Sequence, residues 1–384
     1  MQLSKEQLRF SWQQDKRRQR KRLLRMIALT VAVFVLCLCF RYNAYYFSDK
    51  FVPVEYFRSY VLAARLLLSR LLDTALWHQR EELIAALDGV IYAGALAQLR
   101  NMLVAFVSGA ALATAGAIFQ TAYRNPMASP NLIGASAGVG LGNVVVVMVC
   151  STAALENVYL RYEYCYAFTV ICVGLVLLLG RLAGSRDSNY SILEMVMAGS
   201  IVSQVIRVFT MYFMYNLPDE ELVLYEEISF GVYNSTDKYS MIVFFSIMAM
   251  SLLPVMLMRY RLNALGMTRL ETAALGLDTR RLRTIAQICG VLMSACAMIH
   301  CGERIGMVSL VIPYIIRQRL GLDFRYLALY SALAGGVLLL LCRLITSFVM
   351  IADAPLPISF AIELLLTPLF MFILATYRRN SDAD

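Results

Sequence analysis

The sequence predicts an all-α, polytopic membrane protein with about ten transmembrane helices, and three observations support this fold class. The 384 residues are 60% hydrophobic and only 16% charged, and the mean hydropathy of +0.64 lies outside the range of ordinary soluble domains. Apolar stretches of the length that crosses a bilayer recur along the chain. Lys and Arg gather beside these stretches, so membrane orientation explains the net charge of +9 better than nucleic-acid binding does.

Residues 1–24 form a basic N-terminal segment, and residues 25–42 form the first predicted span. A cleaved signal peptide is the alternative for this pattern. The small-x-small cleavage site expected after the apolar core is missing, because Arg41 and Tyr42 follow it. An uncleaved span with a cytoplasmic N-terminus is therefore expected, and the basic segment is interpreted as a solvated charge run beside the lipid rather than a nucleic-acid site.

Residues 43–99 are expected to lie outside the cell. Apolar residues at helical spacing in 54–76, with Arg58, Arg65 and Arg70 on the polar side, predict an interfacial or external helix. The alternative is an eleventh hydrophobic segment, which three arginines oppose.

The core at 100–377 contains the other nine predicted spans. These are 100–121, 130–150, 164–181, 191–214, 239–258, 284–301, 305–320, 326–349 and 356–377. Alternation then places the arginine-rich loops, including 259–283, and the tail 378–384 in the cytoplasm, as the positive-inside rule requires. The stretches 151–163 and 215–238 become outer loops, so we expect a multi-pass protein of the cell membrane with both termini cytoplasmic.

The cysteines and histidines indicate no enzyme or metal site. The nine cysteines lack paired metal spacing, and those in apolar spans are read as small core residues rather than redox or metal groups. The two histidines, His78 and His300, form no cluster. No catalytic residue, cofactor or metal is therefore expected on this chain.

A polar break interrupts the apolar sequence at 116–140. Its charged and Pro-containing centre cannot face lipid hydrocarbon, where unsatisfied backbone and charge are costly. Small residues follow, and these let helix backbones approach closely in membranes. The residues expected to serve helix packing or a pathway, here and in a later run at 305–317, are Gly116, Gln120, Asn125, Pro126, Pro130, Gly134, Ser136, Gly138, Gly306, Pro313 and Tyr314.

The connector 259–283 looks like two short helices broken at glycines. Its small apolar face is of the kind that docks on another protein, and a solvated connector is an equal alternative on spacing alone. The candidate docking residues are Leu265, Gly266, Leu270, Ala273, Ala274, Gly276 and Leu277.

Two charges fall inside predicted spans, Arg207 in the fifth and Glu363 in the tenth. Intramembrane charges are functional candidates by default, and a buried structural pair is the alternative. Met and Tyr are abundant in and just after the fifth span, which suits either a soft pathway for a bulky substrate or ordinary packing.

Four short sequence segments follow one another along the chain in an order that is characteristic of one family. They are the run 116–142, the Leu-Gly and Ala-x-x-Leu-Gly pattern of 265–277, the run 305–317 and the Leu-Pro-Ile-Ser at 356–359. Together they resemble the FecCD family, the membrane permeases of ABC importers for iron-siderophores, haem and cobalamin, over roughly residues 97–377. The resemblance implies an all-helical, ten-span permease that works as a homodimer, or with a similar permease subunit, around a central pathway.

The resemblance also implies partners. The segment 262–280 would be the coupling element that grips a separate ATPase. A substrate-binding lipoprotein or periplasmic binding protein would deliver the metal chelate, with Arg58 and Arg65 as its docking candidates. The sequence contains no GxxxxGK[ST] phosphate loop, so ATP would be bound and hydrolysed on the partner subunit.

The sequence departs from the family pattern at three places. Tyr314 stands where the family commonly has His after Pro, Cys342-Arg343 stands where it often has Ala-Asp, and Ser359 ends a segment in which Gly is usual. These departures concern substrate and docking contacts rather than the fold. Two further classes stay open on the sequence, namely a secondary transporter or channel driven by ion gradients and a membrane scaffold or receptor without transport.

Overall fold

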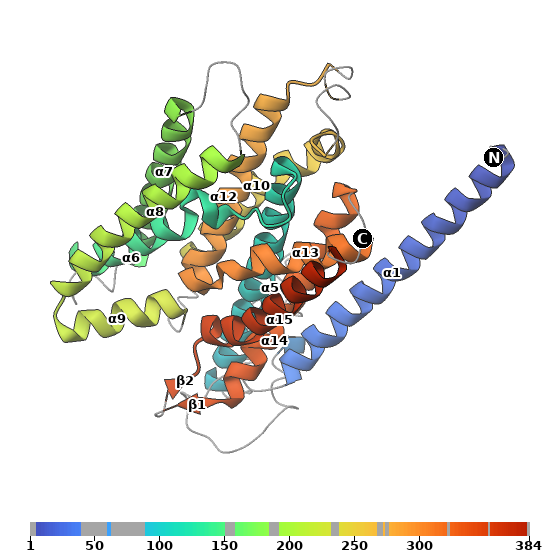
Figure 1. The fold of residues 1–384 in the computed structure, drawn as a ribbon. Coiled ribbons are helices and arrows are strands. Elements are labelled where there is room, and N and C mark those ends of the chain that lie inside the picture. Colours follow the sequence, from blue (N-terminus) through green and yellow to red (C-terminus); the bar gives the residue numbers. More distant parts are fainter. Residues whose placement is uncertain are drawn as a thin grey trace, which may run out of the picture.

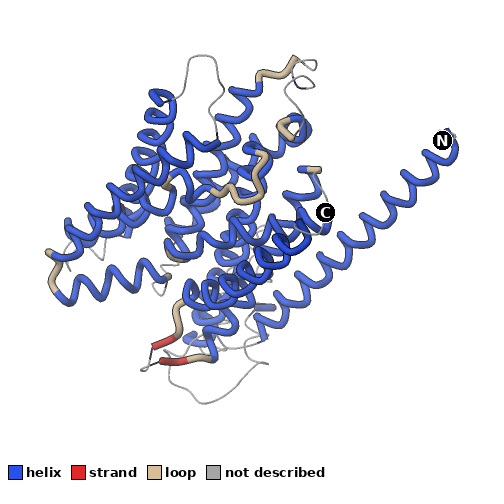
Figure 2. Tube along the Cα trace, in the orientation of Figure 1, coloured by secondary structure: helices blue, strands red, loops and turns tan. Residues whose placement is uncertain are grey.

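The computed structural model describes residues 5–39, 60–62, 89–149, 158–183, 192–231, 238–266, 272, 276–320, 323–351 and 354–381 (Figure 1). Within these ranges the chain is almost entirely helical (Figure 2), which confirms the predicted fold class. The exception is a short antiparallel pair, β1 (Met350–Ile351) and β2 (Ala354–Pro355), which pairs Met350 with Pro355. The all-helical prediction missed this pair.

Each of the ten predicted spans coincides with a helix of the described chain. The elements are α1 (Lys5–Cys39), α5 (Gly89–Tyr123), η1 (Pro130–Ile133), α6 (Ala135–Val149), α7 (Val158–Ala183), α8 (Ile192–Tyr215), α9 (Asp219–Phe230), α10 (Lys238–Ala264), α12 (Thr279–Cys301), η3 (Glu303–Met307), α13 (Val308–Leu320), α14 (Phe324–Phe348) and α15 (Ile358–Ser381). Several boundaries differ from the prediction. Helix α1 begins within the basic segment, and α5 begins within 43–99.

The interpretation of 215–238 as a plain loop was wrong, because it contains α9. Three acidic residues, Asp219, Glu220 and Glu221, occupy the first turn of this helix, where they favour the positive end of the helix dipole. Gly231 ends it with a φ of 81°, a left-handed conformation that glycine adopts without a steric penalty. The acidic residues of this stretch therefore stabilise the start of a helix.

Helix α5 lies at the centre of the bundle, with α14 and α12 packed most extensively against it (Figure 1). Gly109 of α5 faces Gly335 of α14 so closely that a Cβ on either glycine would collide with the backbone carbonyl group of the other. Such contacts suit membrane helices, which pack through small residues because lipid removes the hydrophobic drive between them. The chain is thus held together by close backbone approaches around one central helix.

Five helices of the described chain are long and apolar enough to cross a membrane, and shorter apolar helical stretches occur in α6, α7 and α15. The chain is a multi-pass membrane protein. Helix α1 packs mainly on α14 through Val33, Cys37 and Leu340, while its first turns project away from the bundle (Figure 1).

The polar break is a compact turn between α5 and α6. Arg124 adopts a left-handed φ of 52°, and the side-chain oxygen of Asn125 accepts a hydrogen bond of 2.9 Å from the backbone N–H of Met127. Pro130 then opens η1, and Gly134 closes η1 with a φ of 83° before α6 begins. Backbone hydrogen bonds within the turn, such as the one from the N–H of Ala128 to the carbonyl of Asn125, pair part of its polar backbone, as a non-helical segment between two membrane helices needs.

Candidate functional site

The connection between α10 and α12 is the first candidate site. The description of 259–283 as two short helices needs correction at its ends, since α10 runs on to Ala264 and α12 begins at Thr279. Leu270, Ala273 and Ala274 lie outside the described residues, so the expected apolar docking face is described only at its flanks. Those flanks are Leu265 and Gly266 on one side and Gly276 and Leu277 on the other.

The α10 flank is anchored to the polar break. Leu265 is only 1% exposed, and its backbone carbonyl accepts a hydrogen bond of 2.8 Å from Nε of Arg124. Gly266 follows on the surface. Arg124, in the centre of the polar break, therefore fixes the start of the α10–α12 connection, although 141 residues separate the bonded pair.

On the α12 side, the connection ends in an exposed turn that leads directly into the capped start of α12. Gly276 has a φ of 65°, and a Cβ placed there would meet no atom within 4 Å. The backbone N–H of Leu277 donates to the carbonyl of Thr272 over 3.4 Å, which closes the turn. Asp278 caps α12 by accepting hydrogen bonds of 3.1 Å from the N–H groups of Arg280 and Arg281. Gly276 and Leu277 are thus reachable from outside, while the helix behind them is firmly capped.

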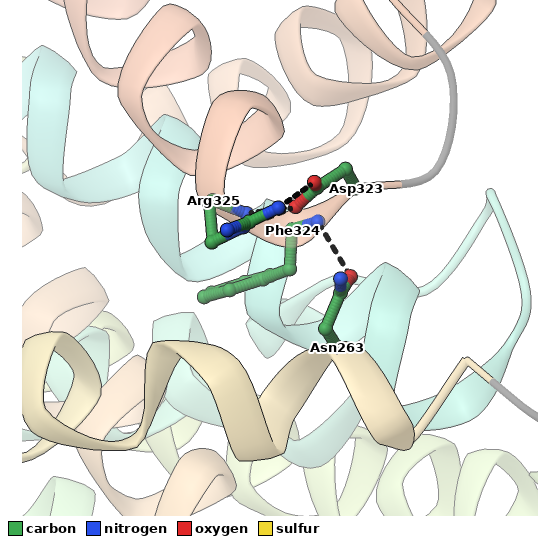
Figure 3. A network of polar contacts seen from close by, with 4 residues as sticks. All are labelled: Asn263, Asp323, Phe324 and Arg325. Atoms are coloured by element: carbon green, nitrogen blue, oxygen red, sulfur yellow. Dashed lines mark hydrogen bonds and ion pairs between the residues drawn. The ribbon is translucent and has the colours of Figure 1, made fainter. Parts of the chain in front are cut away.

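A further polar contact ties α10 to α14 (Figure 3). The side-chain oxygen of Asn263 accepts a hydrogen bond of 2.9 Å from the backbone N–H of Phe324, the first residue of α14. Asp323 caps the same helix, and its carboxylate also pairs with the guanidinium of Arg325 at 2.7 Å. Its hydrogen bonds to Arg325 hold the pKa of the Asp323 carboxyl below its usual value.

Helix α13 is fastened to α5 through residues of the two predicted packing runs. Nε2 of Gln120 donates to the carbonyl of Leu310 over 3.0 Å, and Nη2 of Arg317 donates to Oγ1 of Thr121 over 3.0 Å. Gly116 faces the Ser309 carbonyl, where a Cβ would collide with the backbone, and Cγ of Pro313 would lie 2.9 Å from the same Cβ. The first and third pieces of the sequence pattern therefore meet in space.

The remaining predicted packing residues gather around η1, α6 and η3. A Cβ at Gly138 would lie 2.6 Å from Cα of Thr169 in α7, and one at Gly306 would overlap the side chain of Asn131. Pro130 is buried and Ser136 partly buried, whereas Pro126 is exposed. The Tyr314 hydroxyl accepts a hydrogen bond of 2.9 Å from Nε2 of Gln318.

The charged candidates are scattered. Arg207 is exposed on α8 and Glu363 is partly buried on α15, and no hydrogen bond or ion pair joins these two described residues. Arg343, at a departure from the family pattern, is buried in α14. Arg58 and Arg65 lie outside the described residues.

Sequence reasoning missed three functional candidates in the structure. The Asn263 cap and the Arg124 anchor join elements far apart in the chain, and nothing in the local sequence announces these contacts. Glu303 is the third, because its Oε2 is buried beneath Gly140 without a hydrogen bond. Its signal was available, since a charged Glu303-Arg304 pair stands between two apolar spans.

Comparison with known proteins agrees with this architecture. Residues 87–376 match the model of the FecCD transport family. An ABC transporter permease protein of Methanocaldococcus jannaschii is 30% identical over 72% of this chain and 80% of its own length. The hemin transport system permease of Yersinia pestis is 26% identical over 74% of this chain and 83% of its own length.

Two more similarities are informative. The vitamin B12 import system permease of Escherichia coli is 28% identical over 73% of this chain and 83% of its own length. Among solved structures, an inward-facing metal-chelate type ABC transporter aligns with a TM-score of 0.71 at 21% identity, covering 93% of this chain and 99% of the other. At that identity the structural similarity concerns the fold.

Proposed function

Because the chain belongs to the FecCD transport family, we propose that it is the permease subunit of an ABC importer that moves a ferric siderophore, haem or related metal chelate inward. The family match over 87–376 carries the proposal, since it spans both the α10–α12 connection and the membrane helices. The hemin and vitamin B12 permeases among its relatives support a chelate as cargo. The membrane is then the cell membrane, with both termini cytoplasmic.

The energy comes from a separate ATPase that docks on the 262–280 segment. The open turn at Gly276 and Leu277 offers the contact, and the Asp278 cap makes α12 respond to it as a unit. The other flank is bonded to the polar break through Arg124 and to α14 through Asn263. A displacement of the connection therefore reaches α5, α12 and α14 together, as alternating access requires.

The importer also needs partners in and above the membrane. Several helices carry large exposed apolar side chains, among them Val208 of α8, Leu257 of α10 and Phe372 of α15, at 65%, 75% and 70% exposure. These faces suit lipid and a second permease, either another copy or a similar subunit. A substrate-binding protein delivers the chelate from outside, and Arg58 and Arg65 are its candidate contacts.

The experiment is reconstitution of the full chain with the candidate ATPase and binding protein in lipid vesicles. Gly276→Glu with Leu277→Arg should lower chelate-dependent ATP turnover by about ten-fold or more, because a bulky charged pair disrupts a docked interface by over about 1.4 kcal/mol. Val223→Glu is the matched control, since Val223 is 57% exposed on α9, away from the connection. Failure of the chain to co-purify with an ATPase, or unchanged turnover in the double variant, would refute the coupling.

A further inference from the structure

The outward face of α10 carries a continuous apolar stripe. Its exposed residues recur three or four positions apart, which is the spacing of one helical face. They are Ile242, Phe245, Ser246, Ala249, Met250, Leu253, Met256, Leu257 and Tyr260, and Ser246 alone among them has neither an apolar nor an aromatic side chain. Of the five candidate spans in the described chain, this one is the least buried, at 22% of its most apolar stretch.

The stripe ends at a group of charged and aromatic residues. The sequence has no charged residue between Lys238 and Arg259, and at about 1.5 Å per residue these two lie about 32 Å apart along the helix. The hydrocarbon core of a bilayer is about 30 Å thick. The helix therefore brings Arg259, Tyr260 and Arg261 to the level of the lipid headgroups, where tyrosine is also enriched.

The ring of Tyr260 is contacted by guanidinium groups from two helices. Its centroid lies 5.1 Å from Cζ of Arg259 and 5.2 Å from Cζ of Arg325 at the start of α14. Both distances are within the range of cation–π interactions. Arg259, Tyr260, Arg261 and Arg325 are all exposed. Two helices thus present their cations together on one accessible surface.

One acid, Asp323, belongs to this group. Its carboxylate accepts hydrogen bonds of 3.1 and 2.7 Å from Nε and Nη2 of Arg325, so it offsets the charge of that arginine (Figure 3). Arg259 and Arg261 form no ion pair with a described residue. Three positive charges and one negative charge leave the group with a net charge of +2.

We propose that this group and the adjoining stripe of α10 form a binding site for an anionic phospholipid. The phosphate lies against Arg259 and Arg261, and the acyl chains lie along Leu257 and Leu253. Guanidinium donors match phosphate oxygens in paired hydrogen bonds, and basic residues at the membrane surface attract anionic lipid. The site goes beyond the proposed function and does not depend on it.

A second copy of the chain is a poorer match for this surface. Two copies related by a two-fold axis along the membrane normal bring like ends of the bundle together. At the ends of α10, α12 and α14 that meet here, the described acids are Asp278 and Asp323, and each already pairs with an arginine, at 3.0 and 2.7 Å. Arginines of one copy would therefore approach arginines of the other, and such like-charge contacts are costly.

The ATPase proposed for the α10–α12 connection can cover only part of the surface. A soluble partner can reach Arg259 and Arg261, but Leu253 lies about 9 Å further along the helix, within the hydrocarbon level. A phospholipid has both the charged end and the apolar chains that the surface requires. The continuity of the cations with the stripe therefore favours lipid.

The test measures tryptophan quenching by brominated lipids, with the full chain reconstituted alone in vesicles. Trp12→Phe and Trp77→Phe remove the natural tryptophans, and Tyr260→Trp places a reporter that keeps an aromatic ring beside the arginines. The vesicles contain equal amounts of phosphatidylglycerol and phosphatidylcholine, with bromine on the chains of one or the other. The reporter should favour phosphatidylglycerol by about five-fold or more, as expected from basic residues near anionic lipid.

Charge variants in this reporter background locate the preference. Arg259→Gln with Arg261→Gln should lower it to within about two-fold, whereas Arg259→Lys with Arg261→Lys keeps the charge and should keep most of it. Arg280→Gln with Arg281→Gln is the matched control, because it removes two exposed arginines from the start of α12. If the first double variant does not accumulate, Arg261→Gln alone should lower the preference by about two-fold, and an unchanged preference would refute the site.

The other outcomes are equally decisive. A reporter quenched by neither lipid would mean that protein covers this face, and equal quenching by both lipids would mean that the headgroup is not recognised. An equal loss in the two glutamine double variants would assign the preference to the overall surface charge. Loss of the preference on adding excess soluble glycerol phosphate would mean that the arginines bind free phosphate groups. Each of these results refutes the lipid site, whereas a failure of ATP-driven uptake would overturn only the proposed function.

Discussion

Gly116 and Gly276 are both glycines beside functional segments, but they are glycines for opposite physical reasons. At Gly116 the helical backbone would suit any residue, and the Ser309 carbonyl of α13 leaves no room for a Cβ. At Gly276 a Cβ would meet no atom within 4 Å, and the φ of 65° is what disfavours a side chain. The first glycine therefore belongs to a close contact between two helices, and the second belongs to an exposed turn.

The largest effect is expected from Gly116→Ala. The added Cβ collides with backbone, which cannot move aside as a flexible side chain can, so α5 and α13 must separate at a cost of about 3 kcal/mol or more. Thermal unfolding of the full chain in detergent measures this loss. Gly174→Ala in α7 is the control, since no atom lies within 4 Å of its Cβ position, and alanine should stabilise that helix by up to about 1 kcal/mol. Equal melting temperatures for Gly116→Ala and Gly174→Ala would mean that the close contact at Gly116 does not exclude a Cβ.

Gly276→Val tests the other glycine and should cost about 1–2 kcal/mol, because a β-branched residue is strained at positive φ. Asn tolerates this conformation, so Gly276→Asn should cost clearly less. We expect the Gly276→Asn variant to be more thermally stable, and to show more ATP-driven uptake, than the Gly276→Val variant. If both variants behave alike, conformation is not what the position requires.

Arg124 combines both kinds of constraint, since it adopts a φ of 52° and donates to Leu265. Arg124→Ala loses the hydrogen bond and keeps the strain, whereas Arg124→Gly loses the bond and relieves the strain by about 1 kcal/mol. The bond contributes about 1–2 kcal/mol, so unfolding free energy should rank wild type first, Gly second and Ala third. An alanine variant more stable than the glycine variant would contradict the left-handed assignment.

Asn263→Ala should destabilise the protein by about 1 kcal/mol, because the first amide of α14 loses its side-chain acceptor. Asn263→Asp keeps an oxygen acceptor and is the matched control. Hydrogen exchange at the start of α14 should accelerate in the alanine variant and stay slow in the aspartate variant. Equal exchange in both would mean that the contact does not hold this end of the helix.

The smallest effect is expected at Asp323, whose pair with Arg325 is partly exposed. Its pKa is lowered in the folded state, so its stabilisation is present above the unfolded value of about 3.9 and is lost as pH falls through the folded value. Asp323→Asn should therefore cost less than about 1 kcal/mol at neutral pH and nothing at a pH below both values. Unfolding measured across this acid range checks the sign.

The membrane helices could be predicted because the length of an apolar run is visible in the sequence of that run alone, without knowledge of its partners. Helix α9 was missed because 215–238 was interpreted only as the connection between two predicted spans, although acids in a first turn and a terminal Gly231 are also helix signals. The contacts of Arg124 and Asn263 had no local signal at all. Their partners are 141 and 61 residues away, and only the packing of α5, α10 and α14 brings them within reach.

The hydrogen bonds of Asn263 and Leu265 together connect the end of α10 to two other parts of the chain. Asn263 is bonded to the first residue of α14, and Leu265 is bonded to Arg124 in the turn that follows α5. Hydrogen bonds weaken steeply with distance and angle, so a displacement of this end of α10 weakens both contacts together. The end of α10 is therefore a junction at which three parts of the chain, distant in sequence, share one position.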